Sequence, residues 1–156
     1  MKTKKYISTI LFFVLFACCS QIKQEKEKLY KEINLKEYYN ETGIIFNKEY
    51  TVSSLLKNIK YRYSPDIEDV KKAEDKFFMS LKAINSTNNY SKWVRQYVGY
   101  IDKNENKNIV ISFINNSQPR KVVRLLGKNW KLDYVEMLSD EFYKINYYYV
   151  VNIDIN

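Results

Sequence analysis

Histidine is absent from this 156-residue chain, and glycine and proline are scarce, with three and two residues. The missing histidine excludes Ser-His-Asp and Cys-His catalysis and most zinc sites. Three glycines are too few for a glycine-rich phosphate-binding loop. The two cysteines, Cys18 and Cys19, are adjacent near the N-terminus. The remainder of the chain therefore has no disulfide framework and no thiol nucleophile.

These absences leave carboxylate chemistry as the remaining route to catalysis. The densest acidic cluster, Asp66, Glu68 and Asp69, is typical of a helix start, where the helix dipole favours negative charge. A glycosidase-type pair needs two carboxylates roughly 5 to 10 Å apart across a cleft, and the sequence does not place Asp133 or Glu136 in that way. We therefore expect no catalysis, no cofactor and no metal site.

The first 17 residues have the composition of an export signal. Three lysines, Lys2, Lys4 and Lys5, precede an apolar run over residues 6–17. This run is shorter than the roughly 20 residues that a membrane-spanning helix needs, but it fits the apolar region of a signal peptide.

The end of this run, Leu15-Phe16-Ala17-Cys18, resembles the lipobox of bacterial lipoproteins. The resemblance implies cleavage before Cys18 and acylation of its thiol, and therefore a lipoprotein of the bacterial cell envelope. We expect it in the outer membrane if the cell has two membranes. The alternative is an ordinary secretory signal with two incidental cysteines. Acyl chains would anchor the chain stably, since each buried methylene contributes about 0.8 kcal/mol.

Three regions are predicted on this basis. Residues 1–17 form a lipoprotein signal peptide, residues 18–28 a polar tether, and residues 29–156 a single α+β domain. From residue 18 onward the chain carries 23 basic and 18 acidic residues, a net charge of +5. That balance suits an anionic membrane surface or a glycan. No basic face interleaved with aromatic residues is evident, so we expect no nucleic-acid partner.

The clearest element is a helix over residues 64–84. Ser64 is suited to cap its start and Pro65 to occupy the first helical position. Apolar residues then recur three or four positions apart, as in an amphipathic helix. These are Ile67, Val70, Ala73, Phe77, Phe78, Leu81 and Ile84.

Alternating apolar residues predict four strands after this helix, over residues 90–101, 108–114, 130–137 and 142–155. Before the helix, residues 29–39 are expected to form a short helix and residues 44–46 a short strand. The order predicts an α+β fold in two layers, with the long amphipathic helix packed on the apolar face of a four-stranded antiparallel meander. In element order it resembles cystatin-like folds.

Five residues are candidates for ligand binding, because aromatic side chains could line the concave side of the sheet and residues 95–100 form a distinctive polar and aromatic segment. They are Trp93, Arg95, Gln96, Tyr97 and Trp130. The alternative is packing of these side chains under the helix. The segment Gln96-Tyr97-Val98-Gly99 is similar to the Gln-x-Val-x-Gly loop of cystatin-type protease inhibitors. Its glycine comes one residue early and lies inside a predicted strand, which argues against inhibition.

These features predict a lipid-anchored, non-catalytic envelope module that binds a protein or a glycan. One alternative is a small-ligand-binding protein, or a carboxylate-dependent enzyme, with an aromatic cleft. Another is an inhibitory or immunity-type lipoprotein.

Overall fold

The computed structural model describes residues 29–52, 58–84, 89–135 and 145–154. The predicted signal peptide, the acylation site Cys18 and the tether lie outside these residues. The strands and helices are β1 (Tyr30–Ile33), β2 (Gly43–Phe46), β3 (Ile59–Tyr63), α2 (Ile67–Ala83), the 3-10 helix η1 (Tyr90–Lys92), β4 (Val94–Asp102), β5 (Lys107–Ile114), α3 (Pro119–Leu126) and β6 (Asn146–Asn152). No helix among the described residues is long and apolar enough to cross a membrane.

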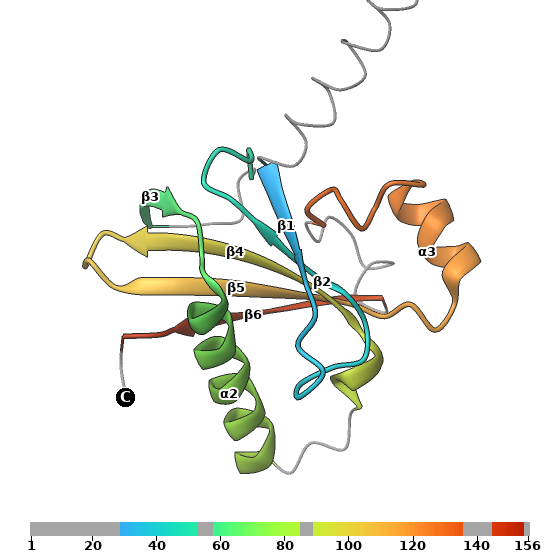
Figure 1. Ribbon diagram of the computed structural model, residues 1–156, viewed down its shortest axis with the longest axis horizontal. Coiled ribbons are helices and arrows are strands. Elements are labelled where there is room, and N and C mark those ends of the chain that lie inside the picture. Colours follow the sequence, from blue (N-terminus) through green and yellow to red (C-terminus); the bar gives the residue numbers. More distant parts are fainter. Residues whose placement is uncertain (1–28, 53–57, 85–88, 136–144, 155–156) are drawn as a thin grey trace, which may run out of the picture.

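The sheet has six strands in the order β1-β2-β4-β5-β6, and β3 also pairs with β4 (Figure 1). Strands β2 and β4 are parallel, with Ile45 opposite Tyr97, whereas the other pairs are antiparallel. The α+β class is confirmed, but the four-stranded antiparallel meander is wrong. Strand β4 is nine residues long, so that β2 pairs with its first half and β3 with its second half.

Three predicted elements differ from the structure. Residues 30–33 form β1 instead of a helix, because Ile33 and Leu35 are buried on either side of the exposed Asn34, a period of two. The described part of the predicted strand 130–137, which ends at Val135, forms turns that cover the sheet. Within the described part of the last predicted strand, residues 145–154, the strand is β6, and residues 142–144 and 155 of the predicted range are outside the described residues.

Helix α2 begins two residues later than expected. Asp66 is its N-cap, and its carboxylate accepts a hydrogen bond from the Asp69 amide at 2.8 Å. The Asp69 carboxylate in turn accepts from the Asp66 amide at 3.4 Å, which completes a capping box. The Ser64 hydroxyl instead accepts from the Lys48 amide at 3.0 Å. The acidic cluster therefore serves helix capping, as its position at a helix start suggested.

The central strands are buried on both faces, whereas the sequence predicted one apolar face. Helix α2 covers one face with Val70, Ala73 and Phe77. Helix α3 and the segment that follows it, residues 127–135, cover the other (Figure 1). Every residue from Val94 to Tyr100 is consequently buried.

Gly99 permits close contact between β4 and the chain that leads into α2. A Cβ atom at this position would lie 2.7 Å from Cγ of Pro65 and 2.8 Å from Cε1 of Tyr63. The pairing of β4 with β5 continues without interruption through this residue. The glycine therefore makes room for β3 and for the start of the helix, and no bulge occurs there in the pairing with β5.

We expect Gly99→Ala to lower the free energy of unfolding by about 1–3 kcal/mol, because the added methyl group overpacks a closed site. Chemical denaturation measures this change. Ser117→Ala, an exposed substitution, is the control and should change stability by less than about 0.5 kcal/mol. Equal stability of Gly99→Ala and the wild type would contradict the close packing.

Candidate functional site

The five predicted ligand-binding residues lie on opposite faces of the sheet. Trp93, Arg95 and Tyr97 are on the side of α2, whereas Gln96 and Trp130 are on the side of residues 127–135. Trp93 is half-buried and the other four are buried. The alternation of side chains along β4 separates Arg95 and Tyr97 from Gln96, so the five residues do not form one aromatic surface.

Arg95 and Tyr97 converge on Glu74 of α2. The Arg95 Nε–H donates to Oε1 of Glu74 at 3.4 Å, and the Tyr97 hydroxyl donates to the same oxygen at 2.8 Å. The guanidinium also donates to the backbone carbonyl of Trp93 at 2.7 Å. Its Cζ atom lies 4.6 Å from the centre of the Tyr39 ring and 4.8 Å from that of Phe113, so both rings contribute cation–π contacts.

The side chains of Glu74 and Arg95 have no exposed surface. Burial raises the pKa of Glu74, although Arg95 and Tyr97 oppose the shift. A ligand in solution has no access to this pair, which holds α2 against β4. Glu74 was not among the predicted residues, although its position in the sequence carried a signal. Glu74 follows Val70 by four positions and precedes Phe77 by three, which places a charge on the apolar side of the helix.

We expect Arg95→Met to lower the free energy of unfolding by about 3–5 kcal/mol, because it leaves the Glu74 carboxylate buried without a cation. The double variant Arg95→Met/Glu74→Leu should lose less than Arg95→Met alone, since both buried charges are then gone. Denaturant unfolding of the wild type, the two single variants Arg95→Met and Glu74→Leu, and the double variant tests this coupling. A double variant whose loss of unfolding free energy equals the sum of the losses of the two single variants would contradict the coupling.

Gln96 holds the segment on the opposite face. Its Nε2 donates to the backbone carbonyls of Trp130, Lys131 and Asp133 at 3.1, 3.2 and 2.8 Å. Its Oε1 accepts from the Val135 amide at 2.8 Å. These hydrogen bonds hold residues 130–135 over the face of the sheet, away from a strand edge.

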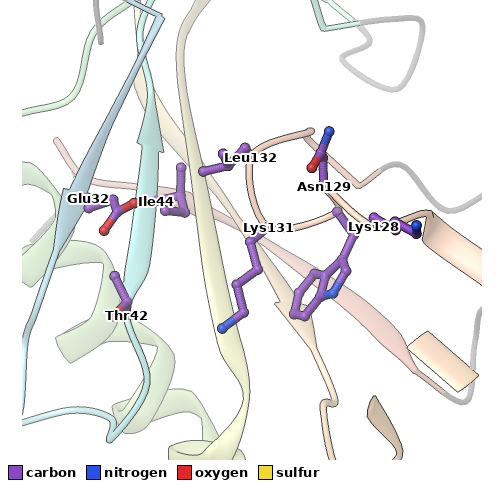
Figure 2. A pocket seen from close by; sticks show the side chains of 8 residues that line it. Glu32, Thr42, Ile44, Lys128, Asn129, Lys131 and Leu132 are labelled. Carbon is purple, nitrogen blue, oxygen red and sulfur yellow. The ribbon is translucent and has the colours of Figure 1, made fainter. Parts of the chain in front are cut away.

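A cleft of about 420 Å³ lies between this segment and strands β1 and β2. Figure 2 shows Glu32 of β1, Thr42 and Ile44 on one wall and the residues of the turn on the other. The residues that line it are Glu32, Thr42, Ile44, Lys128, Asn129, Trp130, Lys131 and Leu132. Its volume falls within the roughly 300–1,000 Å³ of small-ligand sites.

The cleft has an apolar base and a polar rim. Ile44 and Trp130 are 2% and 4% exposed, so little of their surface is open to a ligand. Glu32, Lys128, Asn129 and Lys131 are exposed. The Lys131 ammonium lies 5.6 Å from the centre of the Trp130 ring. The cleft therefore offers a ligand two ammonium groups, one carboxylate, one amide and one hydroxyl, together with apolar surface that includes the half-buried Leu132.

Sequence reasoning found one residue of this cleft, Trp130, and one that positions it, Gln96. It missed Lys128 and Lys131, although both flank the tryptophan in Gly127-Lys128-Asn129-Trp130-Lys131. It missed Glu32 and Thr42, which reach the site only because β1 and β2 join the sheet beside β4.

Comparisons with known proteins found no matching protein family, no similar curated protein and no similar solved structure.

Proposed function

We propose that this chain is a lipid-anchored module of the bacterial cell envelope that binds a glycan, without catalysis, in the cleft between β1–β2 and residues 128–132. The observation that carries the proposal is the polar rim of the cleft. Polar side chains surround a partly apolar cleft, and this combination suits the hydroxyl groups and the apolar ring face of a sugar.

The functional groups of the rim match those of a saccharide. Sugar hydroxyls can donate to Glu32 and to the Asn129 carbonyl and accept from Lys128, Lys131 and the Asn129 amide. An acidic substituent on the sugar would pair with the two lysines, which outnumber the single carboxylate.

The functional groups of the cleft rim are also the basis for proposing that the protein has no catalytic activity. Hydrolysis of a glycosidic bond by the common mechanism requires two carboxylates flanking that bond. Among the described residues that line the cleft, Glu32 is the one carboxylate. The anchor and the location are proposed from the lipobox-like Leu15–Cys18, and the net charge of +5 from residue 18 onward is compatible with an acidic envelope.

The segment that approaches the inhibitor loop is buried in the structure. Gln96, Tyr97, Val98 and Gly99 all lie inside β4, paired with β5. They present no exposed tip to a protease, so the glycan proposal is preferred to inhibition.

A soluble fragment of peptidoglycan, a disaccharide bearing a carboxylate, is a suitable first probe for the cleft. We expect it to bind, and Lys131→Ala and Glu32→Ala each to weaken binding about fivefold or more, since each removes a hydrogen bond to a charged group. Isothermal titration calorimetry measures the affinity. Lys72→Ala, an exposed change on α2, should leave it unaltered. No binding, or equal losses in all three variants, would contradict a glycan site in this cleft.

The anchor is tested in cells. We expect Cys18→Ser to move the protein from the membrane fraction to the soluble fraction or to leave it unprocessed, because the thiol that accepts the diacylglycerol is gone. Mass spectrometry of the wild-type protein should find acylated Cys18 at the N-terminus. Cys19→Ser is the matched control and should stay with the membrane. A wild-type protein without acyl groups would refute the anchor.

A further inference from the structure

The positive charge of the chain is concentrated in one short segment. Residues 119–131 contain five basic residues and no acidic residue. From residue 18 onward the chain has 23 basic and 18 acidic residues. The rest of this region is therefore neutral, and the whole excess of +5 belongs to α3 and the turn that follows it. The basic residues are Arg120, Lys121, Arg124, Lys128 and Lys131.

Three of these residues are exposed, and we call them together the α3 ridge, namely Arg120, Arg124 and Lys128. Arg120 and Arg124 lie on the helix, whereas Lys128 follows its end and also lines the cleft. Arg120 and Arg124 are four positions apart and so share one side of the helix. Val123, which is 38% exposed, lies on the same outer part of α3. The inner side of the helix packs through Val122 and Leu126 against Trp130 and the sheet.

The helix accommodates the charge of the ridge only in part. Arg124 lies in the last turn of α3, where the helix dipole favours positive charge. Arg120 is in the first turn, where the helix dipole disfavours positive charge, and no acidic residue is present there. Like charges four positions apart, as in Arg120 and Arg124, also repel each other. None of the three ridge residues forms a salt bridge within the described part of the chain. An external anionic surface would compensate this charge.

We infer that the α3 ridge docks on the anionic headgroups of the membrane to which the chain is attached. The inference rests on the lipid anchor of the proposed function, which keeps this surface within reach. The tether of residues 18–28 spans at most about 40 Å when fully extended, so the domain remains close to the bilayer. Basic residues near an anionic leaflet each strengthen attachment by about fivefold, and the exposed Val123 can enter the headgroup region.

The test uses the chain from residue 18 onward with Cys18 and Cys19 replaced by Ser, so that no acyl chain contributes. Sedimentation with vesicles measures its binding to phosphatidylcholine alone and to phosphatidylcholine with 30% phosphatidylglycerol. We expect binding to the anionic vesicles only, weakening as salt is added. The triple variant Arg120→Gln/Arg124→Gln/Lys128→Gln should bind about 100-fold more weakly.

The matched control removes three positive charges elsewhere, with Lys36→Gln, Lys72→Gln and Lys103→Gln, all exposed positions. It should retain most of the binding, and circular dichroism should show both triple variants to be folded. Equal losses in the two variants would show attraction to the overall charge and overturn the ridge. Absence of binding to anionic vesicles would overturn it as well.

The alternative occupant of the ridge is an anionic polysaccharide. Polygalacturonate, a soluble carboxylated polysaccharide, distinguishes it from the membrane. If the double variant Arg120→Gln/Arg124→Gln, which leaves the cleft residue Lys128 in place, loses polygalacturonate binding while vesicles do not bind, the ridge holds an anionic polymer and the membrane inference is wrong. The acyl anchor does not enter these measurements. Vesicle binding together with an unacylated cellular protein would therefore support the ridge and refute the anchor. An acylated cellular protein whose soluble form does not bind anionic vesicles would support the anchor and refute the ridge.

Discussion

The layers on both sides of the sheet depend on the hydrogen bonds of two adjacent side chains in its middle strand, Arg95 and Gln96. Both side chains are polar and buried, so they need partners away from water. Because successive side chains of a strand point to opposite faces, Arg95 binds Glu74 of α2, whereas Gln96 binds the backbone of residues 130–135. A buried polar group without a partner costs about 1–3 kcal/mol. Each of these layers therefore has one favoured position on the sheet.

The cleft follows from the second of these interactions. Gln96 holds the turn that carries Trp130 and Lys131 over the face of the sheet next to β2. The parallel pairing of β2 with β4 then brings Thr42 and Ile44 opposite the turn. A polar residue without exposed surface thus shapes a site that it does not line.

The sequence predicted the parts of the fold that have a local signal. The amphipathic period and the acidic first turn located α2, and alternation located β4 and β5. The parallel β2–β4 pair had no such signal, because it joins Ile44 to Gln96 across 52 positions of sequence. The segment 130–135 has the alternation of a strand but meets a side chain instead of a strand edge. For the same reasons the sequence found Trp130 and Gln96 for the candidate site, but not Glu32 or Thr42, which only long-range pairing brings there.

The parallel pairing of β2 with β4 also has a kinetic consequence. Strands β1 and β2 have four residues each, and an isolated two-stranded hairpin is marginally stable at best in water. Their docking has to wait until β4, synthesised later, offers its edge, and contacts between such distant segments form slowly. During biogenesis the wall of the cleft formed by Glu32, Thr42 and Ile44 is thus assembled late, and a newly made chain passes through a stage in which its apolar β2 is open to proteases and chaperones.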